Sequence, residues 1–130
     1  MNLLDTDHCI AILRGQLDLG AQISPDEELA TTAVSVAELA HGAQRSQRRE
    51  DNLARLEVLL STLVVLPFDE AAGRRFGVLK AELESRGEVL DDLDLQIASI
   101  AIETGSVLLS NNTKHFRRIA GLSLENWLAR

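Results

Sequence analysis

The sequence predicts an α/β fold with three layers, in which helices cover both faces of a mostly parallel central sheet of four to five strands. Short apolar runs suited to buried strands alternate with longer segments of helical periodicity. Such alternation favours parallel pairing, because a helix carries the chain back to the same edge of the sheet. The 130 residues contain no repeat or linker, so we expect a single domain over residues 1–130.

The predicted strands are short and rich in Leu, Val and Thr. They lie at residues 2–4, 30–34, 64–66 and 106–109, with a last edge strand at 122–124. The first ends on Asp5 and the third stops at Pro67, which cannot donate to a sheet. Each of the first four strands is followed by a polar residue that can begin a helix, as the predicted alternation requires.

The predicted helices are bounded by capping residues and glycines. They lie at residues 8–14, 36 to about 41, 53–63, 69–87, 90–105 and 113–119. Ser35 and Glu38 match a capping box, in which the N-cap and the third helical residue exchange hydrogen bonds. Residues 24–27 resemble another helix start, with Pro25 at the first helical position. Residues 95–102 are apolar almost all round, so we expect a buried helix there.

Composition excludes several classes of protein. The net charge of −7 argues against nonspecific coating of DNA. Cys9 is the only cysteine, which excludes an internal disulfide and favours a small buried side chain, and the three histidines lack the spacing of a zinc site. No apolar run approaches the ~20 residues of a membrane span, and the first residues do not form a signal peptide. We therefore expect a cytoplasmic protein that does not enter the membrane.

Polar side chains gather where the predicted strands end. Asp5 and Asp7 follow the first strand, Glu38 and Asn112 follow the second and fourth, and Asp94 lies in the first turn of the buried helix. Taken singly, each acid can be a helix cap, with Asp7 capping the first helix. Taken together, they would meet at one sheet edge, where carboxylates bind a hard cation such as Mg²⁺. Such a cation can activate water and neutralise phosphate in phosphodiester cleavage.

Four segments and the C-terminal end resemble, in order, the motifs of PIN-domain ribonucleases, most closely the VapC-type toxins of toxin–antitoxin pairs. The segments are residues 3–7, 34–39, 94–98 and 108–116, followed by residues 121–122 and 125–127. The resemblance therefore covers nearly the whole chain. Each motif is weak alone, but four in order at this length are specific.

The resemblance assigns roles to single residues. Asp5 and Asp94 resemble the two metal-binding aspartates of the family, and Glu38 resembles the acid between them, which holds metal directly or through water. Asn112 stands where many relatives have Asp, so the site has one charge fewer and the number of metal ions stays open. Asp7 stands where many relatives have Asn, and it is expected to support the site.

The resemblance also implies an activity and partners. It implies cleavage of structured RNA, often tRNA, with Mg²⁺ or Mn²⁺ as cofactor, a homodimer, and neutralisation by a small antitoxin protein. Apolar residues at 53–63 and 95–102 offer surface for association. Basic residues should contact RNA phosphates. The best placed are Lys114, His115, Arg117 and Arg118, and the others are Arg14, Arg45, Arg48 and Arg49.

Two other functions are compatible with parts of the sequence. Residues 4–7 resemble the nucleophile motif of haloacid-dehalogenase-like phosphatases, and Lys80 precedes Asp91 and Asp92 in the order of that family. However, no apolar strand precedes this acidic pair, so Asp91 and Asp92 are better explained as helix caps. The other alternative is a PIN fold that only binds a partner, but the complete set of acids favours catalysis.

Overall fold

The fold is built on one five-stranded sheet in which every neighbouring pair of strands is parallel, in a computed structural model that describes residues 1–24 and 26–128. The strand order is β3-β2-β1-β4-β5. The strands are β1 (Asn2–Leu4), β2 (Leu29–Thr32), β3 (Val64–Leu66), β4 (Val107–Leu109) and β5 (Ser123–Glu125). The predicted fold class and the last edge strand are confirmed, with β5 one residue later than expected.

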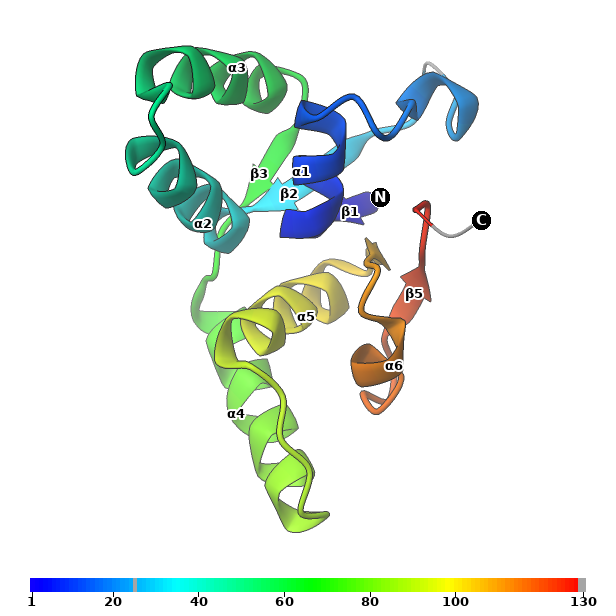
Figure 1. Cartoon of the computed structure of the whole chain (residues 1–130). Helices are drawn as coiled ribbons and strands as arrows, with labels where there is room; N and C mark the ends of the chain where they lie inside the picture. Colours follow the sequence, from blue (N-terminus) through cyan, green and yellow to red (C-terminus); the bar gives the residue numbers. More distant parts are fainter. Residues whose placement is uncertain (25, 129–130) are drawn as a thin grey trace.

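Helices cover both faces of this sheet (Figure 1). The elements are α1 (Thr6–Leu13), η1 (Leu19–Ala21), α2 (Ala33–Gln44), α3 (Arg49–Ser61), α4 (Glu70–Ser85), α5 (Asp92–Thr104) and α6 (Thr113–Phe116). In Figure 1, α1, α2 and α3 lie above the strands, and α4, α5 and α6 lie below them. The predicted three layers are therefore present.

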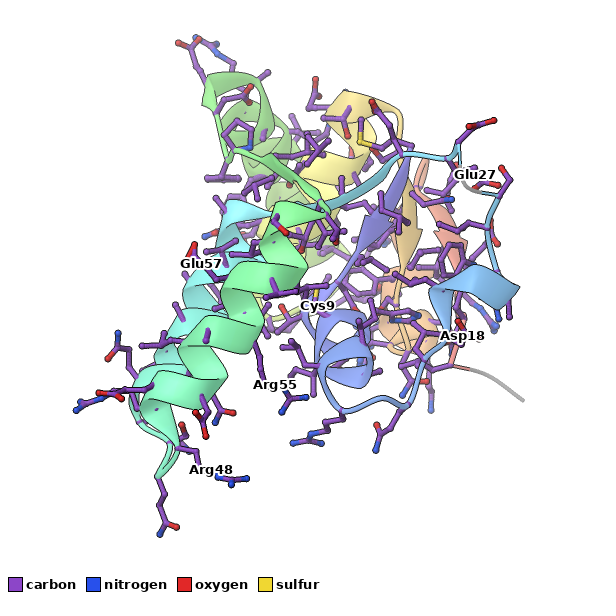
Figure 2. All side chains as sticks on the ribbon, turned by 90° about the horizontal axis from the view of Figure 1, so that it is seen from above. Cys9, Asp18, Glu27, Arg48, Arg55 and Glu57 are labelled. Carbon is purple, nitrogen blue, oxygen red and sulfur yellow. The ribbon has the colours of Figure 1, made fainter. Side chains whose placement is uncertain are left out.

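Two apolar clusters fill the space between the layers, because successive strand residues point to opposite faces. In β1, Leu3 packs in the cluster of α4 and α5, whereas Leu4 packs with residues of α1, α2 and α3. Leu108 and Leu109 divide in the same way in β4. Cys9 belongs to the second cluster and lies deep inside the molecule (Figure 2). Burial raises its thiol pKa to about 11, which confirms the expected small buried side chain.

Helix α5 is covered within the chain. Leu95, Ile97, Ile100 and Ala101 are each at most 1% exposed, and the helix packs along α4. The buried helix expected from the sequence is confirmed. The same burial corrects the expectation that residues 95–102 offer surface to a partner, because α4 and the sheet already cover them. No helix in the described part of the chain is long and apolar enough to span a membrane.

The start of α2 differs from the prediction. Thr32, and not Ser35, is the N-cap, and its hydroxyl accepts a hydrogen bond from the backbone N–H of Ser35. The strand β2 therefore ends at Thr32, which pairs with Leu66 of β3. Both Ser and Thr are favourable N-caps and Ser is somewhat the better, so the choice of Thr32 depends on strand pairing that the local sequence does not contain. The capping box is wrong, and Glu38 is free for another role.

Three other boundaries are also corrected. α1 begins at Thr6 with Asp5 as its N-cap, so Asp7 is a first-turn residue and not the cap. No helix begins in the described residues around Asp26, because the chain runs directly into β2; Pro25 itself lies outside the described residues. The Glu27 carboxylate instead accepts bonds from Asn2 and from the Ser24 backbone N–H, which holds this segment beside β1. Helix α6 ends at Phe116, three residues before the predicted end at 119.

Candidate functional site

The predicted acids meet at the carboxyl edge of the sheet. Because all strands are parallel, the segments that follow β1, β2 and β4 leave from the same edge. The backbone N–H of Asp5 donates to the carbonyl of Leu109 over 3.1 Å, which holds the end of β1 beside the end of β4. Helix α2 also packs against α5, and this brings Glu38 toward Asp94. We call Asp5, Glu38 and Asp94 together the acidic site.

Asp5 is the most tightly held member of the acidic site. The residue is 7% exposed, and Oδ1 accepts from the backbone N–H of His8 at 2.8 Å as the N-cap of α1. The His8 ring nitrogen Nδ1 lies 3.1 Å from the same oxygen. No described residue donates to Oδ2, so that oxygen is available to a ligand.

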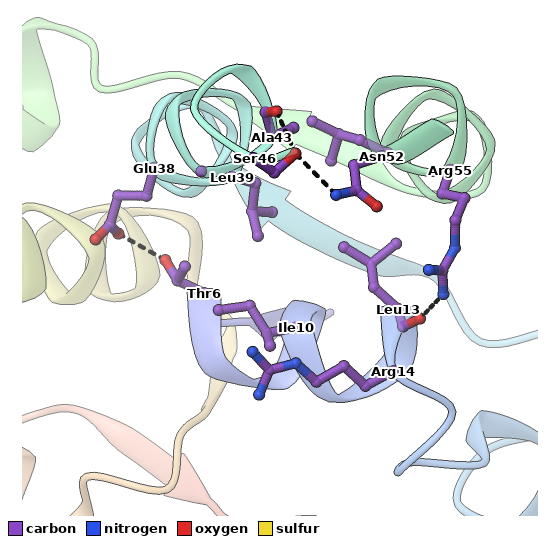
Figure 3. A pocket seen from close by; sticks show the side chains of 12 residues that line it. Thr6, Ile10, Leu13, Arg14, Glu38, Leu39, Ala43, Ser46, Asn52 and Arg55 are labelled. Atoms are coloured by element: carbon purple, nitrogen blue, oxygen red, sulfur yellow. Dashed lines mark hydrogen bonds between the residues drawn. The ribbon is translucent and has the colours of Figure 1, made fainter. Parts of the chain in front are cut away.

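Glu38 is positioned by the first helical residue after Asp5. The hydroxyl of Thr6 donates to Oε1 of Glu38 over 2.6 Å (Figure 3). The same hydroxyl lies 2.9 Å from the hydroxyl of Ser35. This contact joins α1 to α2 across 32 residues of sequence. Glu38 therefore points to the Asp5 end of α1 and does not cap its own helix.

The pKa of Asp94 is affected by the negative charges of the other acids. It lies in the first turn of α5, where Asp91 is the N-cap and accepts from the backbone N–H groups of Leu93 and Asp94. Partial burial, as the largest cause, and the negative charges of Asp91, Glu38, Asp5 and Asp7, in that order, together raise the pKa of Asp94 to about 6. Asp5 and Glu38 therefore lie close enough to Asp94 for their charges to act on its carboxylate.

Asn112 occupies the corresponding position after β4. Its backbone N–H donates to the hydroxyl of Ser110 over 2.9 Å, and its side-chain carbonyl lies 2.5 Å from Nδ1 of His115. The amide is half-buried and brings no charge to the edge. It can accept or donate a hydrogen bond, which suits the orientation of water or substrate.

The acidic site fits a hard divalent cation in the kind of ligand that it offers. Carboxylate oxygens are the preferred ligands of Mg²⁺ and Mn²⁺, and Mg²⁺ retains several water ligands. Within residues 1–24 and 26–128, no three His, Cys, Asp or Glu side chains are close enough to form a ready metal cage. The pKa of Asp94 is raised first by burial and then by the neighbouring acids, and a bound cation would offset both effects on its carboxylate.

A groove leads away from Glu38 between α1, α2 and α3 (Figure 3). It has a volume of about 390 Å³ and an apolar floor that includes Ile10, Leu39 and Leu56. Arg14 and Arg55 lie at its other end, where Arg55 reaches from α3 to donate to the carbonyl of Leu13 (Figures 2 and 3). One end of the groove is therefore acidic and the other is basic.

The predicted basic residues are placed unequally. Lys114 and Arg117 are exposed on and beside α6, just after Asn112. Arg118 is held by the protein, because its guanidinium donates to the carbonyl of Val89 over 3.1 Å and lies 3.9 Å from Glu88. Arg48 projects outward at the turn between α2 and α3 (Figure 2).

The phosphatase arrangement is not assembled. The Lys80 ammonium donates to the Asp92 carboxylate over 2.9 Å on the surface, and Asp91 caps α5. Capping by Asp91 is therefore confirmed, while Asp92 is an ion-pair partner and not the cap. Two supporting residues escaped the sequence analysis, Thr6 and His8. His8 contacts Asp5 only three residues away, but its contact with Trp127 and the contact of Thr6 with Glu38 join residues far apart in the chain, which local sequence does not reveal.

Comparisons with known proteins identify the class. The family model described as PIN domain matches residues 3–122. Ribonuclease VapC2 of Rickettsia felis is 33% identical over 129 residues, which covers 96% of each chain. The tRNA(fMet)-specific endonuclease VapC of Shigella flexneri is 33% identical over 127 residues, again with 96% of each chain covered. This chain therefore belongs to the PIN-domain family and, within it, to the VapC ribonucleases.

A solved structure agrees with this assignment. The structure of VapBC2 from Rickettsia felis, bound to a DNA fragment from their promoter, matches with a TM-score of 0.90 and 32% sequence identity. The match covers 97% of this chain and 98% of that chain. The sheet and its covering helices are thus the fold of this family.

Proposed function

We propose that this protein is the toxin of a toxin–antitoxin pair, an endoribonuclease that hydrolyses phosphodiester bonds in structured RNA with Mg²⁺ or Mn²⁺ as cofactor. The observation that carries the proposal is that Asp5, Glu38 and Asp94 all lie at the carboxyl edge of the sheet, near enough for the charges of Asp5 and Glu38 to raise the pKa of Asp94, in a chain of this family. tRNA is the substrate class, because the Shigella flexneri relative is named for cleavage of tRNA(fMet).

Each residue of the acidic site has a distinct task. Asp5 offers Oδ2, Glu38 is fixed by Thr6, and Asp94 contributes a charge that a cation stabilises. When bound, the cation supplies charge neutralisation at the phosphate and a more acidic water molecule. Asn112 orients the water or the substrate through its amide.

Substrate binding is assigned to the exposed cations beside the site. Lys114 and Arg117 follow Asn112 directly and can neutralise phosphates next to the cleaved bond. Arg118 is less available to RNA, because its guanidinium donates to the backbone carbonyl of Val89. Substitution of Lys114 or Arg117 should therefore weaken RNA binding and its salt dependence more than substitution of Arg118 does.

The antitoxin is assigned to the groove between α1, α2 and α3. A partner segment lying on the apolar floor would reach Glu38 and would cover the acidic site. Ribonuclease VapC2 of Rickettsia felis is a relative of this chain. The solved structure that matches this fold is described as VapBC2 from the same organism. If this assignment is correct, Gly42→Arg, whose added side chain would enter open space on the exposed groove wall, should abolish inhibition by the cognate antitoxin while cleavage is retained. Inhibition at wild-type antitoxin concentrations would place the partner elsewhere.

A homodimer is also part of the proposal. Since α5 is covered, the surface for association is the exposed apolar stretch from α3 to the residues after β3. Val58 is 68% exposed, Val65 is 42% exposed and Phe68 is 37% exposed. Burying these side chains in a symmetric interface would remove apolar area from water. Light scattering of the antitoxin-free protein should give a dimer for wild type and a monomer for Val58→Asp. A wild-type monomer at micromolar concentration would contradict the dimer.

Cleavage of tRNA by the purified protein tests the activity. Antitoxin-free protein should cut a pool of tRNA with Mg²⁺ or Mn²⁺, and EDTA should stop the reaction. Mapping the cleaved ends would then identify the target, with tRNA(fMet) as the first substrate to examine. Asp5→Ala, purified in the same way, should be inactive. Undiminished cleavage by that variant would show that the acidic site is not the catalytic site.

A further inference from the structure

His8 is fully buried at the third position of α1, and both of its ring nitrogens are engaged. Nδ1 lies 3.1 Å from Oδ1 of Asp5. Nε2 lies 3.1 Å from the backbone nitrogen of Trp127, which is 119 residues away in sequence. The imidazole therefore connects the C-terminal segment to the first acid of the acidic site.

The contact with Trp127 determines where the ring proton lies. A backbone N–H group can only donate, so Nε2 of His8 must accept and cannot carry a proton. In a neutral imidazole the proton is then on Nδ1, which donates to Asp5. The contact between His8 and Asp5 is thus a hydrogen bond from a neutral ring and not an ion pair.

This bond limits how the Asp5 carboxylate can turn. The backbone N–H and the ring N–H of His8 reach the same oxygen, Oδ1, from two directions. Two contacts to one oxygen hold Oδ1 against His8 and leave Oδ2 without a donor among the described residues. Trp127 in turn fixes the ring, since its backbone donates to Nε2 and its side chain packs in the cluster that contains Leu4 and Cys9.

We propose that His8 is a positioning residue, which as its Nδ1–H tautomer aims the Asp5 carboxylate at the cation, and that the backbone of Trp127 selects this tautomer. The proposal rests on the proposed metal-dependent function, because it assumes that Asp5 is a ligand. Supporting residues of this kind typically change metal affinity about 10- to 100-fold when they are removed.

The tautomer can be measured without any metal. Nitrogen NMR of the histidine rings in the EDTA-treated wild-type protein distinguishes a protonated from an unprotonated ring nitrogen. We expect the His8 signals to show a proton on Nδ1 and none on Nε2. A proton on Nε2 would overturn the proposal, whatever the variants show.

Two matched variants separate positioning from packing. In His8→Asn the amide can stand where Nδ1 stood and can still donate to Asp5, but it cannot reach Trp127. In His8→Gln the amide stands near Nε2, so it can accept from Trp127 but loses the donor to Asp5. Both remove the ring. Titration calorimetry with Mn²⁺ should give His8→Asn an affinity within about 3-fold of wild type, and His8→Gln an affinity about 10- to 100-fold weaker.

The outcomes are distinguishable. Equal weakening of Mn²⁺ binding in both variants, with equal melting temperatures in EDTA, would mean that His8 only fills space, and the proposal would be overturned. If Asp5→Ala binds Mn²⁺ as tightly as wild type, the metal site itself fails, while the tautomer measured by NMR stands. Weaker binding in His8→Gln alone, with wild-type melting, would support positioning.

Discussion

Asp5 and Asp94 lie at the same edge of the sheet, each next to a helix N-terminus, but their carboxylates are held in opposite ways. Two N–H groups of His8 donate to Asp5, which is almost fully buried. Asp94 is only partly buried, no described side chain donates to it, and its pKa is raised to about 6. The fold therefore stabilises one carboxylate as part of its scaffold and opposes the charge of the other.

The helix dipole does not explain this difference. It favours an acid in the first turn by about 0.3–1 kcal/mol, and both residues benefit from it. For Asp94 this benefit is outweighed by burial and by the charges of Asp91, Glu38, Asp5 and Asp7. The comparison indicates that hydrogen bonds within the protein hold Asp5, whereas the surroundings of Asp94 disfavour its charge, which the proposed cation would stabilise.

The largest expected effect separates the two roles of Asp5. Asp5→Asn retains an oxygen that can cap α1 but removes the charge, so RNA cleavage should fall more than about 100-fold while stability changes little. Asp5→Ala should lose cleavage equally and also about 1 kcal/mol of stability, because the cap is gone. Activity assays and chemical denaturation of both variants measure this. Full activity in Asp5→Asn would show that Asp5 acts only as a cap.

The next effect concerns the support of Glu38. Thr6→Val keeps the shape of the side chain but removes the hydroxyl that donates to Glu38. Because a residue that orients a ligand is removed, cleavage should fall about 10-fold while the melting temperature stays close to that of wild type. Thr6→Ser retains the hydroxyl and is the control. Equal losses in both variants would point to packing by the Thr6 methyl group.

A smaller effect tests whether the surroundings of Asp94 disfavour its charged carboxylate. Asp94→Asn removes a charge that its surroundings oppose, so the EDTA-treated variant should be more stable than wild type by on the order of 1 kcal/mol, after allowance for solvent screening. The rise in melting temperature that Mn²⁺ gives wild type should be reduced, because a ligand is lost. Thermal melts with EDTA and with Mn²⁺ measure both changes. A variant that melts lower in EDTA and keeps the full Mn²⁺ response would identify Asp94 as a simple helix cap.

Because the pKa of Asp94 is raised in the folded protein, the free energy of unfolding depends on pH. The folded-state pKa of Asp94, about 6, lies above the value of about 3.9 for an unfolded chain, so between these values the folded protein binds more protons. The Asp94 contribution is therefore most favourable below pH 4 and is lost as pH rises through 6. Relative to Asp94→Asn, EDTA-treated wild type should lose stability across this range. A difference that is constant with pH would contradict the raised pKa.

The smallest effect is expected at Asp92, the exposed partner of Lys80. Asp92→Asn removes a charge only two residues from Asp94, but Asp92 is not among the groups that raise the pKa of Asp94. Cleavage and the Mn²⁺ response should be unchanged, which makes this variant the control for Asp94→Asn. If both variants lose activity equally, the register of the α5 motif has been misassigned.

Much of the fold could be predicted because local signals agreed with it. The apolar runs gave β1 and β3 with the correct bounds, and Asp69 and Gly105 bound their helices as expected. The errors lie where two local signals compete. Thr32 and Ser35 are both good caps, and only the pairing of Thr32 with Leu66 decides between them.

The position of the candidate acids could be predicted, but the contacts that hold them could not. The placement of Asp5, Glu38 and Asp94 at one edge follows from the rule that parallel strands end at the same edge of a sheet, while their role as ligands stays a prediction from the family resemblance. The hydrogen bond from Thr6 to Glu38 and the one from Trp127 to His8 join segments far apart in the chain. Such contacts depend on how helices pack, which periodicity does not contain.

The pKa of Asp94, measured by NMR of its carboxyl carbon with and without Mg²⁺, tests the account most directly. In EDTA the value should be about 6, because burial and the neighbouring acids disfavour the charge. Mg²⁺ should lower it, since a bound cation favours the ionised form. An ordinary Asp pKa that Mg²⁺ leaves unchanged would show that the acids do not share a cation site.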